Sequence, residues 1–377
     1  MERYFTEHAP KLGFGLMRLP QKDGKIDIEQ TKKMVDLFLA AGQTYFDTAY
    51  VYGADGASEK AAKEALVDRY PRESFTLATK LNVHANGCKS AEDAKRQLEI
   101  SLERTGAKYF DFYLLHAIGE GNIGDYDAYG IWDFVKEAKE KGLVKHWGFS
   151  FHGSTQLLEK LLTDHPDAEF VQLQINYADW ENPDVASHTI YDIARRHGKP
   201  IVVMEPVKGG TLANPPRRVQ EILKAENPDA SFASWAVRYV ASMDGILSVL
   251  SGMSNIAQME DNLSYMKDFQ PLSDREKETI FRAQAALADV KSIPCTACHY
   301  CTEGCPMKIR IPDIFSARNT ELIWEQKDRA QRRYDEITEK SNKASACIGC
   351  GQCEAACPQH IGIIDALREC AKQYEAS

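Results

Sequence analysis

An alternation of short apolar runs with amphipathic segments, from residue 11 to about residue 250, constrains the fold more than any other feature. The amphipathic segments carry apolar residues every three to four positions, which predicts helices. Strands that alternate with helices form parallel sheets. The eight runs expected to be strands cover residues 12–17, 45–47, 75–80, 110–116, 144–150, 170–176, 200–205 and 246–250.

Eight such units predict an α/β fold, a closed (β/α)8 TIM barrel. An open doubly wound sheet is the alternative, but it normally carries a glycine-rich phosphate turn after its first strand, and the GFGLMR segment after Leu12 does not match that turn. The helices are expected at residues 27–41, 58–69, 91–105, 127–141, 154–164, 183–196 and 230–243, with a last helix at 272–289.

The cysteines divide the chain. Cys88 stands alone in the first 290 residues, and the other nine of the ten cysteines follow Ile293. We therefore expect a barrel domain over residues 1–290 and a second domain over 291–377. Two copies of one motif fill the second domain, Cys295-x2-Cys298-x2-Cys301-x3-Cys305-Pro306 and Cys347-x2-Cys350-x2-Cys353-x3-Cys357-Pro358.

The charge pattern limits the partners. The net charge of -9 arises from mixed charges, without the block of basic residues that would bind nucleic acid or an anionic membrane. No apolar run reaches the roughly 18 residues of a membrane span, and the N-terminal segment does not resemble a secretion signal. We expect a cytoplasmic protein, in which clustered cysteines favour thiolate metal ligands over disulfides.

Polar residues stand at the carboxyl ends of the predicted strands, where barrels of this type place their chemistry. They are Asp47, Lys80, His116, Ser150, Gln174, Asn176 and Glu205.

Tyr52 lies just beyond the second strand. A phenol with a pKa of about 10 needs a nearby cation to act as a proton donor at neutral pH. Lys80 supplies that cation, Asp47 holds it, and His116 is placed to hydrogen-bond a carbonyl oxygen.

The segments FDTAYVYG, TLATK and DFYLLH resemble the Asp, Tyr, Lys and His tetrad of the aldo-keto reductase family. The resemblance spans the barrel. It implies that Tyr52 is the general acid or base, that Asp47 and Lys80 tune it, and that His116 orients the substrate carbonyl. Members of the family bind a nicotinamide cofactor in an extended pose across the barrel mouth.

The resemblance also implies a cofactor site. Ser150 and Gln174 match the residues that hold the nicotinamide carboxamide, although Phe151 and Met204 depart from the usual asparagine and stacking aromatic. The glycines after the seventh strand are expected to approach the cofactor, or to form an ordinary flexible loop. The full set is Ser150, Gln174, Gly209, Gly210, Ser251, Gly252, Ser254, Gln258, Asp261 and Asn262.

The nucleotide is either NAD(H) or NADP(H). NADP-dependent relatives usually place a lysine or arginine near the phosphate turn, where this chain has Met253 and Gln258. This pattern favours NAD, because a phosphate dianion lacks a cationic partner. The two departures at the nicotinamide end keep a flavin as a second candidate.

The cysteine motifs resemble the bacterial ferredoxin pattern, in which the fourth cysteine of each run ligates the other cluster. The resemblance implies two [4Fe-4S] clusters in a mainly α-helical ferredoxin domain, one held by Cys295, Cys298, Cys301 and Cys357 and the other by Cys347, Cys350, Cys353 and Cys305. Zinc is the alternative metal. Cys88 and Cys370 belong to neither motif.

The sequence therefore predicts an oxidoreductase that moves hydride between a nicotinamide and a carbonyl or alcohol, with the clusters as an electron relay. Hydride carries two electrons and a cluster carries one, so a flavin is expected as mediator, either in the barrel mouth or supplied by a partner; otherwise the clusters are structural or regulatory. The candidate redox partners are a ferredoxin, a flavodoxin or a flavoprotein. The alternative is an electron-transfer or redox-sensing protein whose barrel binds a nucleotide and a partner with little carbonyl reduction.

Overall fold

A computed structural model describes residues 10–183 and 185–375. The chain forms two compact units. The first comprises the chain up to Asn214 and Glu226–Ile280, and the second comprises Pro215–Ala225 and the chain from Phe281 onward.

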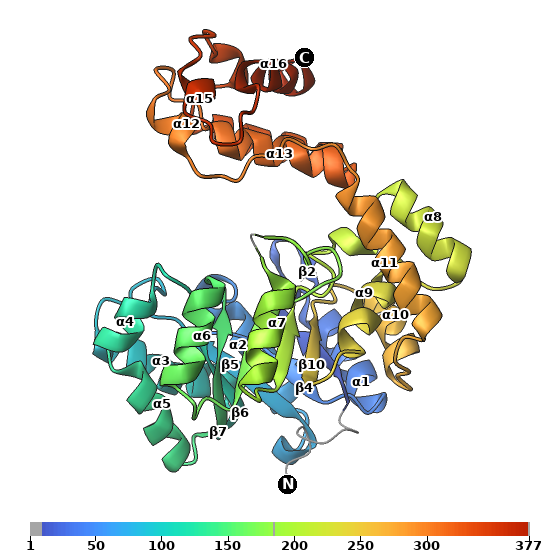
Figure 1. The fold of residues 1–377 in the computed structure, drawn as a ribbon. Coiled ribbons are helices and arrows are strands. Elements are labelled where there is room, and N and C mark those ends of the chain that lie inside the picture. The colour runs from blue at the N-terminus through green and yellow to red at the C-terminus, as the bar shows by residue number, and fades with distance from the viewer. Residues whose placement is uncertain (1–9, 184, 376–377) are drawn as a thin grey trace. The chain divides into compact units, whose positions relative to one another are not determined.

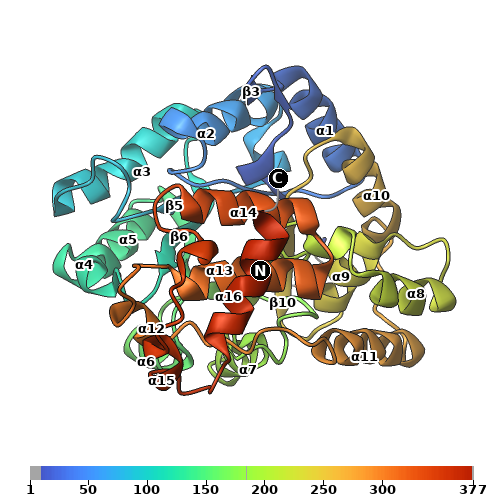
Figure 2. The ribbon, with the colours of Figure 1, turned by 90° about the horizontal axis from the view of Figure 1, so that it is seen from above.

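The first unit is a closed barrel of parallel strands inside a ring of helices (Figures 1 and 2). The strands follow chain order around the barrel, and β10 pairs with β1 to close it, with Leu12 opposite Val249. The predicted (β/α)8 fold is confirmed, and each predicted run supplies one strand. The strands are β1 (Leu12–Gly15), β4 (Tyr45–Asp47), β5 (Thr76–Leu81), β6 (Phe110–Ile118), β7 (Val144–Phe151), β8 (Phe170–Gln174), β9 (Ile201–Met204) and β10 (Ile246–Ser251).

Large apolar side chains fill the barrel. Tyr45, Phe112 and Phe170 are buried in one cluster with aliphatic residues of β5, β9 and β10. A second and larger cluster joins the outer strand faces to the helices, which is the usual double packing of parallel strands. The surrounding helices are α1 (Ile28–Ala40), α2 (Ala57–Ala62), α3 (Ala91–Thr105), α5 (Ile131–Glu140), α6 (Thr155–Asp164), α7 (Ser187–Arg196), α9 (Phe232–Ala241) and α10 (Ile256–Met266).

Three local features differ from the predictions. The helix expected at residues 127–141 is broken by Gly130, whose φ of 61° lies in the left-handed region, so α4 (Ile123–Ala128) ends before α5 begins. A hairpin of β2 (Gln21–Lys22) and β3 (Lys25–Ile26) follows β1, turning at Asp23 and Gly24, which both have positive φ. Helices α8 (Arg217–Glu226) and α10 also lie outside the predicted helix ranges.

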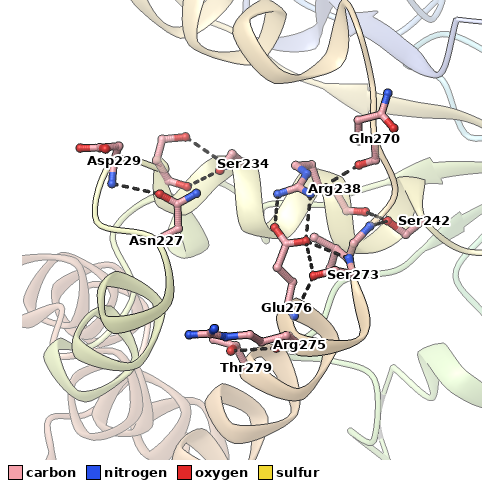
Figure 3. Close-up of polar contacts among 12 residues, drawn as sticks. Asn227, Asp229, Ser234, Arg238, Ser242, Gln270, Ser273, Arg275, Glu276 and Thr279 are labelled. Carbon is pink, nitrogen blue, oxygen red and sulfur yellow. Dashed lines mark hydrogen bonds and ion pairs between the residues drawn. The ribbon is translucent and has the colours of Figure 1, made fainter.

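Helix α11 (Asp274–Ala288) starts on a polar cluster that joins it to α9 (Figure 3). Arg238 Nη1 lies 2.7 Å from Glu276 Oε1, and Nη2 lies 3.3 Å from Oε2. The same carboxylate accepts hydrogen bonds from the backbone N and the hydroxyl of Ser273, as in a capping box. The start of α11 is thereby fixed to the barrel.

The second unit is mainly helical, as predicted. The helices of the second unit from residue 300 onward are α12 (Tyr300–Glu303), α13 (Ile311–Trp324), α14 (Lys327–Thr338), α15 (Gln352–Ala355) and α16 (Ile363–Tyr374). Helix α13 packs against α14 and α16, around a core that includes Phe315, Tyr334 and Leu367. None of the helices in the described ranges combines the length and apolar character that a membrane span requires.

Candidate active site

The four predicted catalytic residues meet at the carboxyl ends of three adjacent strands. Asp47 ends β4, Lys80 lies near the end of β5, and His116 lies near the end of β6. Tyr52 lies on the loop after β4, with its ring centroid 5.0 Å from Lys80 Nζ and 5.6 Å from the His116 ring. The structure thus brings together a carboxylate, an ammonium, a phenol and an imidazole.

Lys80 is a fully buried cation with two oxygen partners. Its Nζ donates to Asp47 Oδ1 at 2.5 Å and to the backbone oxygen of Thr48 at 2.7 Å. Burial is the largest single influence on Lys80 and lowers its pKa, but the charges and hydrogen bonds of Asp47 and Tyr52 together raise the pKa by more, so the net shift is upward. The amine therefore stays charged at neutral pH beside the tyrosine ring.

Tyr52 is a protonated phenol at neutral pH. Burial raises its pKa, because a phenolate is poorly solvated there, and the charge of Lys80 opposes this rise without cancelling it. Lys80 therefore limits the cost of forming the phenolate when the proton leaves. The resting structure presents Tyr52 as a proton donor.

His116 is a neutral imidazole. Burial and then the charge of Lys80 lower its pKa to about 3. Its Nδ1 is buried, as is Asp47 Oδ2, and neither atom has a hydrogen-bond partner within the described part of the chain. The next residue, Ala117, has a φ of 54°, where the pairing of β6 with β7 shifts register. An unpaired buried nitrogen beside a phenol suits a polar ligand atom.

A buried ion pair that sequence reasoning missed supports the tyrosine loop. Glu59 in α2 is fully buried and accepts from Thr79 Oγ1 at 2.8 Å and from Arg104 Nη1 at 3.2 Å. The same Arg104 nitrogen donates to the backbone oxygen of Tyr50 at 3.1 Å, two residues before Tyr52. Nothing near Arg104 in the sequence pointed to this contact, because α3 and the loop are far apart along the chain.

The two residues expected at the nicotinamide end lie at the ends of neighbouring strands. Ser150 is buried at the end of β7, where its Oγ accepts from Ala117 N at 2.7 Å and keeps its own proton for another acceptor. Gln174 ends β8, and its Nε2 lies 3.3 Å from Asp179 Oδ2. Asn176 donates to the same carboxylate oxygen at 2.8 Å, and Asp179 also pairs with Lys208.

The expected phosphate turn lies between β10 and α10. Ser251 ends the strand, and Gly252 follows it. Gln258 Oε1 accepts from Ser254 N at 2.7 Å, so this turn amide has a partner within the chain. Asn262 is buried, and its Oδ1 has no hydrogen-bond partner among the described residues. Asp261 instead accepts from Ser231 Oγ at 2.9 Å, which directs it toward α9.

Arg18 brings a cation to this turn that the sequence did not reveal. It follows β1, and barrel closure places β1 beside β10. A Cβ added to Gly252 would lie 3.8 Å from Arg18 Cβ, and one added to Gly209 would lie 3.6 Å from Arg18 Nη1. Gly209 and Gly210 have φ of 62° and 90°, which explains the need for glycine there. Arg18 Nη2 lies 3.4 Å from Glu205 Oε1, so this cation stands near the turn already paired with a carboxylate. Its presence leaves both NAD(H) and NADP(H) as candidates.

Other polar loop residues lie outside this constellation. His84 Nε2 lies 2.6 Å from Asp125 Oδ2 on the surface. Trp180 stacks on His188 with ring centroids 4.5 Å apart and packs against the core, which fits a packing role.

The eight motif cysteines surround two hollows in the second unit, each of about 320 Å³ of empty space, part of it open to solvent. Each hollow takes three cysteines from one motif and the fourth from the other. The first is lined by Cys295, Cys298, Cys301 and Cys357, and the second by Cys305, Cys347, Cys350 and Cys353.

The donor set fits a multi-iron cluster. In residues 10–183 and 185–375, no three His, Cys, Asp or Glu side chains converge closely enough to hold one metal ion. The thiols are spread around a hollow instead, which suits the corners of an iron–sulfur cube better than a single tetrahedral zinc. Cys370 lines neither hollow; it is fully buried, and burial raises its pKa to about 12.

Comparison with known families covers both units. A model of the aldo/keto reductase family matches residues 11–284, and a model of the 4Fe-4S dicluster domain matches residues 294–361. L-galactose dehydrogenase from Arabidopsis thaliana is 23% identical over 299 residues, covering 75% of this chain and 92% of the relative. An aldo-keto reductase from Mycolicibacterium vanbaalenii is 27% identical over 267 residues, covering 71% and 85%.

Solved structures share the barrel fold. An aldo-keto reductase from Bacillus halodurans in its holo form has a TM-score of 0.57 and 24% identity, covering 72% of this chain and 91% of its own. An aldo-keto reductase from Klebsiella pneumoniae in complex with NADPH has a TM-score of 0.58 and 20% identity, covering 72% and 90%. Both predicted resemblances are confirmed.

Proposed function

This chain belongs to the aldo/keto reductase family of oxidoreductases and carries a 4Fe-4S dicluster domain, and from this premise we propose that it transfers hydride between a nicotinamide cofactor and a carbonyl or alcohol substrate. We propose further that the dicluster domain holds two [4Fe-4S] clusters that relay electrons. The corner formed by Asp47, Lys80, Tyr52 and His116 is the observation that carries the first proposal.

Each residue has a distinct role in carbonyl reduction. The Tyr52 hydroxyl gives its proton to the substrate oxygen as that oxygen gains negative charge. Lys80 stabilises the phenolate that remains, and Asp47 holds the ammonium in place through the 2.5 Å contact. His116, neutral and unpaired at Nδ1, binds the substrate oxygen. When bound, the nicotinamide supplies the hydride; in alcohol oxidation the Tyr52 phenolate accepts the proton.

The residues at the barrel mouth fit a dinucleotide. Ser150 and Gln174 offer polar groups for the carboxamide, and the unpaired Asn262 Oδ1 offers an acceptor at the adenosine end. We propose that Gly209, Gly210, Ser251, Gly252, Ser254, Gln258 and Asp261 complete the site. Arg18 and the NADPH-bound relative support NADP(H) alongside NAD(H). Turnover with each nucleotide decides between the two.

The two hollows indicate which cysteines would bind each cluster. We propose that Cys295, Cys298, Cys301 and Cys357 hold one cluster and that Cys305, Cys347, Cys350 and Cys353 hold the other. A flavin, bound in the barrel or brought by a partner flavoprotein or flavodoxin, would connect two-electron and one-electron chemistry, whereas a ferredoxin partner would exchange single electrons with the clusters. The cysteine hollows also favour a second candidate, a protein of electron transfer or redox sensing with little carbonyl reduction.

One anaerobic preparation tests these proposals. Iron, sulfide and extracted cofactor are measured first, with eight iron and eight sulfide per chain expected from two clusters. Reduction of 4-nitrobenzaldehyde by NADH or NADPH is then followed for the wild type and for Tyr52→Phe, where we expect a loss of about 10² to 10⁴-fold. Tyr50→Phe is the matched control. Intact clusters without tyrosine-dependent reduction would favour the second candidate, and zinc in place of iron would overturn the cluster assignment.

A further inference from the structure

The two cysteine-lined hollows have unequal surroundings. Besides its cysteines and apolar residues, the first is lined by three residues with polar side chains, Thr296, His299 and Gln359. The noncysteine residues of the second are all apolar: Pro306, Met307, Ile309, Ile311, Ile348, Ile364 and Leu367. Three polar side chains, all of them exposed, therefore border the first hollow, whereas only apolar side chains accompany the cysteines of the second.

The residue after the third cysteine of each motif reinforces this difference. Thr302 follows Cys301, and its hydroxyl is buried without a hydrogen-bond partner in the described part of the chain. Its proton is free to turn toward the neighbouring sulfur. Glu354 follows Cys353, and its Oε1 accepts from Ile364 N at 2.8 Å, which fixes a carboxylate close to the second hollow. A neutral donor in one motif corresponds to an anion in the other.

Solvent access does not offset this difference. The third cysteine of each motif is buried, the second is exposed, and the first and fourth are intermediate, so the two motifs match position by position. Lys308 and Arg310 follow the first motif but are themselves exposed, where water and salt screen their charges. The polar and charged groups near the sulfurs remain as the distinguishing feature.

Net charge, hydrogen bonds to the sulfurs and solvent exposure set the potential of an iron–sulfur cluster. Reduction adds one negative charge, which donors stabilise and a nearby carboxylate opposes. We propose that the cluster of Cys295, Cys298, Cys301 and Cys357 has the higher reduction potential, so that one electron entering the module moves from the second cluster to the first. The transfer oxidises one cluster and reduces the other, with no bond broken and no proton moved.

This inference rests on the proposed loading with two clusters, and its test separates the two claims. The anaerobic holoprotein is assayed for iron and sulfide, then titrated with dithionite in the presence of redox mediators while the electron paramagnetic resonance signals are recorded. The iron and sulfide content measures how many clusters are bound, and the titration measures the order of their reduction potentials. We expect two one-electron waves at different potentials.

Matched variants assign the waves. Glu354→Gln should raise the lower wave by about 59 mV, a tenfold change in the ratio of reduced to oxidised cluster, and leave the upper wave in place. Thr302→Val and Gln359→Leu should each lower the upper wave only. Glu336→Gln removes the same charge from an exposed position on α14 and should move neither.

Three results would overturn the order of potentials: one shared wave, movement of the upper wave by Glu354→Gln, or movement of the lower wave by both Thr302→Val and Gln359→Leu. A full iron and sulfide count with any of these leaves the loading proposal standing. A chain that contains zinc and no iron overturns both.

Discussion

Lys80 Nζ lies 2.5 Å from Asp47 Oδ1, and both side chains are almost completely buried. Replacing Lys80 by methionine leaves the Asp47 carboxylate buried and unpaired, which should cost about 3 to 5 kcal/mol of unfolding free energy. Urea unfolding of the full chain, followed by circular dichroism, measures this loss. Adding Asp47→Asn should restore part of it. Lys60→Met breaks an exposed pair with Asp55 and should cost less than about 1 kcal/mol; equal losses in both single variants would contradict the prediction.

Arg104 is a positioning residue for Tyr52, through its hydrogen bond to the Tyr50 oxygen. Arg104→Lys keeps a positive charge near Glu59 but loses the rigid, planar guanidinium whose Nη1 donates to both Glu59 Oε2 and the Tyr50 oxygen. We expect kcat for carbonyl reduction to fall about 10 to 100-fold, because small displacements of a proton donor are costly, while the KM of the nucleotide stays unchanged.

The control for Arg104 is Asp55→Asn, which alters an exposed partner of the same guanidinium at 3.6 Å. It should leave kcat close to that of the wild type. If Arg104→Lys lowered only the unfolding free energy and left kcat intact, Arg104 would have a purely structural role.

His116 should make stability depend on pH. Its pKa in the folded chain is about 3, whereas an unfolded histidine has a pKa of about 6.5. Between these values the unfolded chain binds the extra proton, so the unfolding free energy falls as pH falls, by at most about 1.4 kcal/mol per pH unit. Urea midpoints from pH 7.5 to pH 5 should show a shallower slope for His116→Asn. An equal slope in the wild type and in His116→Asn would contradict this prediction.

The Arg238–Glu276 pair should stabilise the barrel through the start of α11 (Figure 3). Glu276→Gln weakens both contacts to Arg238 and those to Ser273, and we expect a loss of about 1 to 3 kcal/mol. Asp274→Asn, at an exposed pair with Lys277, should change stability by less than about 0.5 kcal/mol. Thermal and urea unfolding of both variants provide the comparison, and similar values would argue against the anchoring role.

The crossed cysteine assignment has its own test. Cys305→Ala should remove the cluster of the second motif, and Cys357→Ala should remove that of the first. Iron and sulfide counts with electron paramagnetic resonance identify the cluster that remains. Cys370→Ala should retain both clusters, because this thiol lines neither hollow. Loss of the same cluster in Cys305→Ala and Cys295→Ala would mean that each motif holds its own iron.

The barrel and its corner were predictable because both depend on local periodicity. Apolar runs locate the strands, and the carboxyl ends of parallel strands share one rim, so Asp47, Lys80 and His116 had to lie near each other. Tyr52 lies on a loop, where periodicity gives no position; its place just beyond a strand end made it a candidate, and the resemblance supported its role as the general acid or base.

Contacts between distant segments were not predictable in the same way. Arg104 reaches Tyr50 from α3, and Arg18 reaches Gly252 only because β1 closes against β10. Neither contact leaves a pattern in the residues around it. The end of α4 before Gly130 depends on a single left-handed residue, which helical periodicity alone did not locate.

The exchange of the fourth cysteine between the motifs ties together two segments that α13 and α14 separate along the chain. In the proposed assignment, neither iron site is complete until these helices have folded and brought both motifs together. Loading of each cluster should therefore depend on prior folding of the helices between the motifs. Each cluster would in turn link the two motifs, so the loss of one cluster would remove one of two links and leave the other in place.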